Sequence, residues 1–488
     1  MQHLPGNDVG LPWPSIIMSA AASEPTINRA VVALGSLHRN LSHAPTAEAV
    51  GPNVYTGSFE LYHNAVVGLC RYIDRSSDVG LDAAKETALT ASLLLYCFEV
   101  LCGQDDSAMK HLEGAFTILP RHCNAAEQEN HMRLGKLALA TQNATTIDVL
   151  SQLLLRLASD WLVSGPSYYT ENPLHAVCTT DLPAHFQSTR DAAVHLDALC
   201  SEALRHWEDL FGEAIRLFSN SHGSMPEHLW AHECARECWA IAMARGTRVN
   251  EDPIFAEAIN QTIAALNRWL AAFVPLVESN PASTSLMLLE IQFWQSWMSL
   301  QALFDSDQLL WDLFEDRFER IVSLAERYLR QQSAATSGKA QAIPILRVLS
   351  GLGNNLASCM CLVAECCRDA GIRRRAIDIL SGLGFRGVFD ASFLVAFYRH
   401  IVNEEEARAR AINPGAPVKL QSQDIPKEAR LLGVAMCHCG PDEGDDIFYK
   451  RDHGLMMYVV TSQETGAPEL GASGFRVNRD TLSFDLNR

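Results

Sequence analysis

The chain has 488 residues, of which 48% are hydrophobic and 20% are charged, so it is too apolar to be disordered and long enough for two or three domains. Its formal net charge of −18 argues against a large nucleic-acid footprint, because phosphate binding needs Lys and Arg gathered on one face. Its 14 cysteines, scattered over so large a chain, predict buried free thiols rather than a disulfide framework.

Helical spacing of apolar residues dominates the chain from its N-terminus onward. The expected helices span residues 28–41, 58–74, 82–101, 107–119, 190–218, 226–245, 254–278, 285–304, 307–332, 342–370, 372–381 and 389–411. Polar or Pro/Gly-containing breaks lie near residues 42–56, 120–145, 164–188, 219–225, 333–341 and 412–428. Helices do not alternate with buried strands, which argues against a doubly wound sheet.

Two of these helices are expected to form an antiparallel hairpin. In the second, Ala108, Leu112 and Phe116 recur at helical spacing, with Asp106 or Ser107 as the N-cap and Pro120 as the stop. The turn between the helices, residues 103–106, is short enough to place them side by side. This hairpin should be sensitive to changes in packing.

The last 60 or so residues differ from the rest. Two β-rich runs, residues 447–449 and 455–460, flank a turn signal at Asp452, His453 and Gly454. The sequence therefore predicts an all-α fold, either an irregular α-solenoid or a multi-helix array of antiparallel helical pairs, with a small C-terminal β-hairpin. We expect a helical domain over residues 1–411 and a C-terminal extension, residues 412–488, packed on it.

A glycine pattern at Gly382, Gly384 and Gly387 spells G-x-G-x-x-G, and three acidic residues, 404–406, follow about twenty positions later. A dinucleotide site would need a strand before the glycines, but residues 373–380 have helical spacing and three consecutive arginines. The glycines are therefore interpreted as a helix terminus, and Arg373 as part of a solvated helix end.

Other motifs lack the partners that their chemistry needs. His232 begins a zincin-like pattern, but Arg236 stands where the second histidine ligand belongs. The pair Cys437 and Cys439 has one residue between its thiols, which in extended chain usually points them to opposite faces. We therefore predict no catalytic, cofactor-binding or metal-binding residues, no cofactor and no enzymatic activity.

Four segments together resemble one family, the fungal-specific transcription factor domain that follows the zinc binuclear cluster in many fungal regulators. Residues 24–42 are similar to its opening helix, and residues 62–69, YHNAVVGL, to its "Y-x-x-A-I-x-x-L" helix. Residues 92–119 resemble its segment "F-E-x-L-x-G-x-x-x-x-A-x-x-H-L", and residues 368–391 its late "R-x-x-A-I-x-L-L" segment. On this interpretation residues 404–406 begin the charged end of a late helix.

The chain departs from the family's usual DNA-binding element, a basic segment with six closely spaced cysteines, because its first cysteine is Cys70 and no such cluster occurs. The resemblance implies a nuclear or nucleocytoplasmic regulator of a fungal secondary-metabolite gene cluster that lacks its own zinc cluster. Expected partners are proteins, including a second copy or a DNA-binding co-regulator, and a small-molecule effector, with neither direct sequence-specific DNA binding nor a membrane. The alternative is a helical scaffold or adaptor without a transcriptional role.

Overall fold

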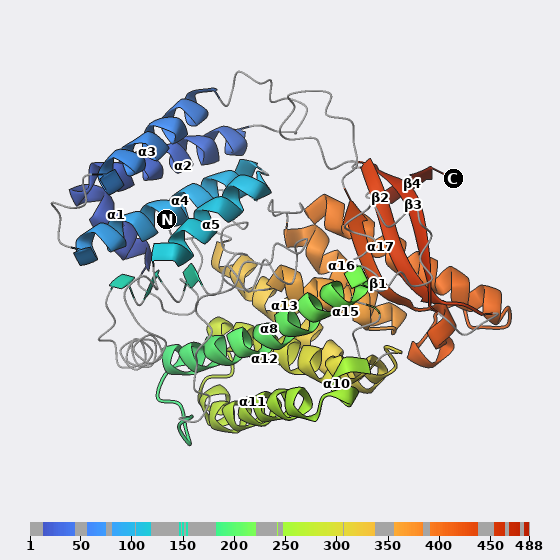
Figure 1. The fold of residues 1–488 in the computed structure, drawn as a ribbon. Coiled ribbons are helices and arrows are strands. Elements are labelled where there is room, and N and C mark those ends of the chain that lie inside the picture. The colour runs from blue at the N-terminus through green and yellow to red at the C-terminus, as the bar shows by residue number, and fades with distance from the viewer. Residues whose placement is uncertain are drawn as a thin grey trace.

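The computed structural model describes residues 13–43, 56–74, 81–102, 104–118, 146–147, 149–150, 153–154, 182–220, 242, 247–305, 307–336, 356–383, 391–437, 453–463, 468–478 and 483–487. Most of these residues are helical, and an antiparallel sheet follows the helices near the C-terminus (Figure 1). The prediction of an all-α array with a small C-terminal β element is confirmed.

Five helices form the N-terminal group: α1 (Trp13–Ser23), α2 (Pro25–His43), α3 (Thr56–Asp74), α4 (Leu81–Cys102) and α5 (Asp105–Ile118). Their apolar faces share one core, in which Leu37, Leu89 and Leu112 are each at most 1% exposed. Helix α1 was not expected, because prolines flank its start. Pro14 is its second residue, where a helix tolerates proline because the missing N–H has no intrahelical acceptor there.

The predicted helical hairpin is confirmed in α4 and α5. The backbone N–H of Gln104 donates to the carbonyl of Glu99 over 2.9 Å, so the chain reverses directly after the last turn of α4. Leu94 and Phe98 of α4 are buried. The side chain of Phe116 lies outside the described residues.

A central group follows: α8 (Thr189–Asn220), α10 (Thr247–Glu251), α11 (Pro253–Ser279), α12 (Thr284–Gln301) and the 3-10 turn η6 (Ala302–Phe304). Helix α11 starts where Asp252 caps it, because this carboxylate accepts the N–H groups of Ile254 and Phe255. Trp269, fully buried, donates its indole N–H to the carbonyl of Ala192 over 2.9 Å and so fixes α11 against α8. Of the helix expected at 226–245, only residue 242 is described.

The last helical group contains η7 (Leu310–Phe314), α13 (Glu315–Thr336), α15 (Leu356–Cys366), α16 (Ala370–Leu383) and α17 (Ala391–Ile412). The helix expected to run to residue 370 instead ends at Cys366. The carboxylate of Asp369 accepts the N–H groups of Gly371 and Ile372, each over 2.8 Å, and so starts α16 as a new helix.

Two 3-10 turns, η8 (Ser422–Asp424) and η9 (Lys427–Ala429), lead to a four-stranded antiparallel sheet in the order β1-β2-β3-β4. Its strands are β1 (Leu431–Cys437), β2 (His453–Thr461), β3 (Pro468–Asn478) and β4 (Ser483–Asn487). The expected turn is misplaced, because His453 and Gly454 lie in β2, opposite Arg476 and Phe475 of β3. Pairing with β3 overrides this local turn signal. The first expected strand, 447–449, lies outside the described residues.

The sheet lies beside α17 (Figure 1). Leu431, Met456 and Val460 of the sheet share a hydrophobic core with Ile401 and Val402 of α17. Apolar side chains from both sides of the predicted boundary at residues 411 and 412 thus pack together. The division into two domains stays a prediction.

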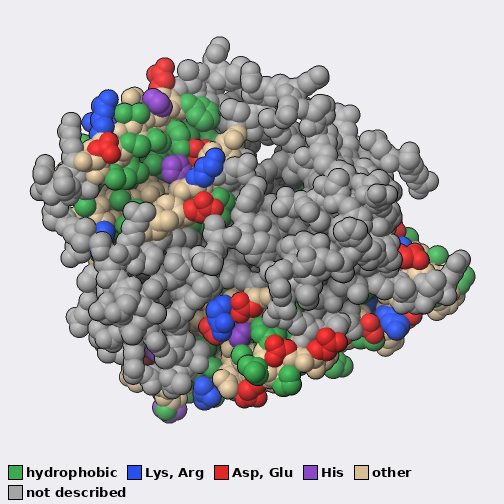
Figure 2. All heavy atoms as spheres, in the orientation of Figure 1, with side chains coloured by type: hydrophobic (Ala, Val, Ile, Leu, Met, Phe, Trp, Pro, Cys, Tyr) green, Lys and Arg blue, Asp and Glu red, His purple; other side chains and the backbone are tan. Residues whose placement is uncertain are grey.

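Figure 2 shows one face of the molecule. Hydrophobic side chains gather over the N-terminal helices at its upper left, whereas acidic and basic side chains are interspersed along its lower edge. The described part of this face therefore mixes both signs of charge.

Candidate functional site

Three residues of the family-like segments meet in the N-terminal core. The hydroxyl of Tyr62 on α3 donates a short hydrogen bond to the carboxylate of Glu99 on α4. The same hydroxyl lies 2.9 Å from Nε2 of His111 on α5. Because a phenol carries a single hydrogen, this arrangement makes Nε2 of His111 the donor to Tyr62. One hydrogen-bonded cluster, Tyr62–Glu99–His111, therefore joins three helices.

Burial sets the electrostatics of this cluster. Glu99 is 6% exposed, and no Lys or Arg in the described part of the chain forms an ion pair with it. Burial raises the pKa of Glu99, although the hydrogen bond from Tyr62 opposes the shift. Burial also lowers the pKa of His111 to about 4, so this imidazole is neutral at pH 7. Burial and the neighbouring carboxylate raise the pKa of Tyr62.

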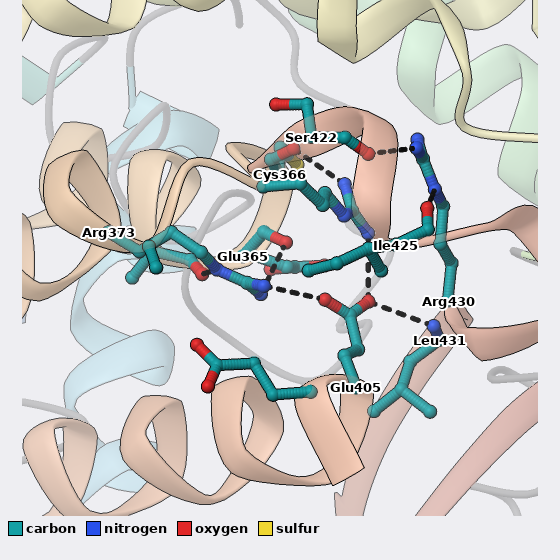
Figure 3. A network of polar contacts seen from close by, with 12 residues as sticks. Glu365, Cys366, Arg373, Glu405, Ser422, Ile425, Arg430 and Leu431 are labelled. Carbon is teal, nitrogen blue, oxygen red and sulfur yellow. Dashed lines mark hydrogen bonds and ion pairs between the residues drawn. The ribbon is translucent and has the colours of Figure 1, made fainter. Parts of the chain in front are cut away.

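A second buried cluster centres on Glu405 of α17 (Figure 3). Its carboxylate accepts hydrogen bonds from Nη2 of Arg368 at 2.9 Å and from Nη1 of Arg373 at 2.7 Å. The backbone N–H of Leu431, at the start of β1, donates to the same carboxylate over 3.0 Å. All three charged side chains are at most 1% exposed, so the Arg368–Glu405–Arg373 triad is a buried ion network.

Gln308 extends this network toward the sheet. It has a left-handed backbone, with φ of 58°, and is 3% exposed. Its amide donates to the carbonyls of Leu431 and Leu432, each over 2.9 Å, and its side-chain oxygen accepts from Arg368 over 2.6 Å. The carbonyl of Gln308 accepts from Arg430 over 2.6 Å. Helices and sheet are thus connected by hydrogen bonds as well as by the shared apolar core.

Arg430 completes the connection. Its guanidinium is 1% exposed and makes a two-pronged contact with Asp312 of η7, at 3.0 and 2.6 Å. Its Nε donates to the carbonyl of Ile425 over 3.0 Å. Arg430 stands immediately before β1 and therefore fixes where the sheet begins relative to η7.

The neighbours of Glu405 set its protonation state. Burial alone would raise the pKa of Glu405, but the guanidinium groups of Arg368 and Arg373 outweigh burial and hold the pKa at about 2. Glu405 is therefore ionised at neutral pH.

The expectation of a solvated arginine run is wrong for Arg373, which is 0% exposed, and correct in part for Arg374, which is 50% exposed. Arg373 lies on the same helical face as Ala370 and Ile377, which are both buried, so the fold carries it into the core. Glu405 and Glu406 lie late in α17, as expected, but they are only 0% and 4% exposed, and they receive these arginines.

The glycine pattern begins at the end of a helix, as predicted. Helix α16 ends at Leu383, so Gly382 lies in its last turn. Gly384 and Gly387 lie outside the described residues. A dinucleotide turn requires a strand at this place, so the helix removes the context that would give the motif its meaning.

The remaining motifs are only partly described. His232 and Arg236 lie outside the described residues, as does Cys439, whereas Cys437 ends β1 and His453 begins β2. Within the described ranges, no three His, Cys, Asp or Glu side chains gather in a way that could hold a metal ion.

Among the described helices, none has the length and apolar character needed to cross a bilayer.

The family model of the fungal specific transcription factor domain matches residues 1–230. The family prediction is therefore confirmed for this part of the chain, which holds the first three resembling segments and the Tyr62–Glu99–His111 cluster. The match supports a transcription-regulator-like role and suggests a nuclear location, and the family is a regulatory one rather than an enzyme family. No curated protein and no solved structure matches the chain. The likeness of residues 368–391 lies beyond the match and stays a prediction.

Sequence reasoning missed the role of Gln308 and Arg430, which lie in no motif. The contacts of Gln308 with Leu431 and of Arg430 with Asp312 join positions more than a hundred residues apart, so no local pattern indicates them. For Arg373 a signal existed, since it occupies the apolar face of its helix.

Proposed function

We propose that this chain is a transcription-factor-like regulator that controls a fungal secondary-metabolite gene cluster through contacts with proteins or a small-molecule effector. The observation that carries the proposal is the family match over residues 1–230. Control of secondary metabolism rests on the resemblance alone, because many members of this family act in that setting.

In this proposal the regulator reaches promoters through a DNA-binding partner. The 488 residues contain no basic segment with six clustered cysteines, and the first cysteine, Cys70, already lies in α3. A net charge of −18 also opposes binding to the phosphate backbone, because each phosphate contact needs a cation.

The two buried clusters support a structural role for the polar residues of the core. Tyr62, Glu99 and His111 join α3, α4 and α5, and Glu405 joins α16, α17 and β1. Since the hydrogen-bonding groups of these clusters face one another rather than solvent, recognition of a partner falls to the surface of the array.

A tethered reporter tests the proposal. The chain is fused to a bacterial repressor that binds its operator upstream of a reporter gene in fungal nuclei, and the repressor alone serves as control. We expect the fusion to change reporter expression several-fold. Expression equal to that of the control, with the fusion folded and nuclear, would contradict the proposal and support the scaffold alternative.

DNA binding is measured separately on the purified chain. We expect no sequence-specific mobility shift with promoter fragments of the gene cluster at physiological salt. A salt-resistant shift at nanomolar protein would overturn the requirement for a DNA-binding partner and leave the regulatory role standing.

A further inference from the structure

The Tyr62–Glu99–His111 cluster leaves one oxygen of its carboxylate unused. The hydroxyl of Tyr62 donates to Oε1 of Glu99, and in the part of the chain that the structure describes no group donates to Oε2. Glu99 is only 6% exposed, so its carboxylate is shielded from most of the solvent. A shielded oxygen without a donor costs free energy, and a ligand that supplies the donor recovers it.

In its ionised form Glu99 also lacks a counter-charge. Among the described residues no Lys or Arg pairs with it. His111 supplies no charge either, because burial lowers the pKa of this imidazole to about 4 and leaves it neutral at pH 7. The other buried carboxylate, that of Glu405, receives two guanidinium groups and a backbone N–H. The cluster around Glu405 is therefore complete, whereas the cluster around Glu99 has room for a cation.

Aromatic rings connect this carboxylate with the surface of the array. Tyr62 and His111 are both partly exposed, although the hydroxyl of Tyr62 reaches the buried Glu99. The ring of Tyr62 stacks on that of Phe98 with centroids 4.5 Å apart, and the ring of His111 meets it edge to face at 6.3 Å. Aromatic rings held in this way attract apolar groups and cations alike. The cluster thus combines an acidic end with an aromatic wall.

The chemistry of the cluster selects among possible occupants. An anion would be repelled by the carboxylate of Glu99. A hard metal cation needs about six or more oxygen ligands, and the described residues bring no three His, Cys, Asp or Glu side chains together for a metal ion. A protonated primary amine needs only one carboxylate, and it supplies both the missing donor and the missing charge. An ammonium group is therefore the occupant that fits best.

We propose that the Tyr62–Glu99–His111 cluster is the polar end of a site for a small-molecule effector that carries a protonated primary amine on an aromatic body. The amine donates to Oε2 of Glu99, and the body packs against the partly exposed rings of Tyr62 and His111. The regulatory meaning of this site rests on the proposed function, because the site names the class of the effector. Protein partners still contact the surface of the array, whereas the effector acts where α3, α4 and α5 are joined.

Calorimetric titration of the full chain tests the proposal and involves no transcription, so its failure is distinct from failure of the reporter assay. The probe is phenethylamine, and the control is 2-phenylethanol, which has the same body with a hydroxyl in place of the ammonium group. Phenethylamine should bind saturably and about tenfold or more tightly than the alcohol, because its hydrogen bond to the carboxylate is charge-assisted. Absence of saturable binding, or equal affinities for the two probes, would overturn the proposal.

Variants locate the site. Glu99→Gln keeps an oxygen for the hydroxyl of Tyr62 but removes the charge, so it should weaken binding of phenethylamine about tenfold or more. Glu60→Gln removes the same charge at an exposed position on α3 and should change the affinity less than about twofold. If Glu99→Gln loses the native circular dichroism spectrum, Glu99→Met replaces it, with the same loss expected. An unchanged affinity in the folded Glu99 variant, or an equal loss in Glu60→Gln, would contradict the proposal.

Discussion

Replacing Arg373 by Met should destabilise the chain far more than replacing its neighbour Arg374 by Met. Arg373 is 0% exposed and donates to Glu405 at 2.7 Å, to the carbonyl of Ala364 at 2.8 Å and to that of Glu365 at 3.3 Å. Arg374 is 50% exposed and forms one ion pair, with Glu406 at 2.7 Å.

The expected difference follows from burial. Removing one partner of a buried ion pair costs about 3–5 kcal/mol, because it leaves the other partner without compensation. In Arg373→Met two carbonyls at the end of α15 also lose their donor, at about 1 kcal/mol or more each, while Arg368 still neutralises Glu405 and offsets part of the loss. We expect a net loss of about 3–5 kcal/mol. Arg374→Met should cost about 0–1 kcal/mol, as exposed pairs do.

Urea denaturation, followed by circular dichroism and tryptophan fluorescence, measures the difference. The midpoint should fall clearly for Arg373→Met and remain near that of the native chain for Arg374→Met. Equal midpoints for the two variants would show that the buried ion network does not hold α16 on α17, and would refute the reasoning.

Three further measurements examine other parts of the structure, and a fourth examines the glycine pattern. The pKa of Glu405 is about 2 in the folded chain and about 4.3 in the unfolded chain. The ionised carboxylate therefore stabilises the fold fully above about pH 4.3, and this stabilisation is lost as the pH falls toward 2. The urea midpoint of Glu405→Gln should accordingly fall less steeply than that of the native chain between about pH 4.3 and pH 2. His111 has a pKa of about 4 when folded and about 6.5 when unfolded, so the native chain loses stability as pH falls through this interval, and His111→Gln should lose less. The left-handed backbone at residue 308 is strained for Ala but not for Gly. In thermal denaturation, the free energy of unfolding of Gln308→Gly should therefore be about 1 kcal/mol higher than that of Gln308→Ala. Titration with NAD, NADP or FAD should give neither heat nor a rise in melting temperature, because Gly382 lies in a helix where a dinucleotide site needs a turn after a strand.

The sequence predicts the helices well where a cap and a regular apolar face coincide. Helix α11 shows this, since Asp252 and Pro253 mark its start and its buried positions recur at helical spacing. The break between α15 and α16 was placed too late, because the cap at Asp369 lies among residues that also continue the apolar pattern.

The polar contacts within the core are harder to predict from sequence. Charge alone suggests that Arg373 and Glu405 are exposed, and only their positions on apolar helical faces indicate otherwise. Gln308 carries no such signal, because its role depends on the arrival of Leu431 and Arg430 from a distant part of the chain. Tertiary packing, rather than local propensity, determines these contacts.

Transcript profiling in the fungus that carries the gene tests the central claim most directly. The strain lacking the gene is compared with the same strain re-expressing the native chain. We predict that transcripts of one contiguous secondary-metabolite gene cluster change several-fold on deletion and return to their original level on re-expression. Unchanged transcripts under conditions in which the chain is present, folded and nuclear in the parent strain would contradict a regulatory role.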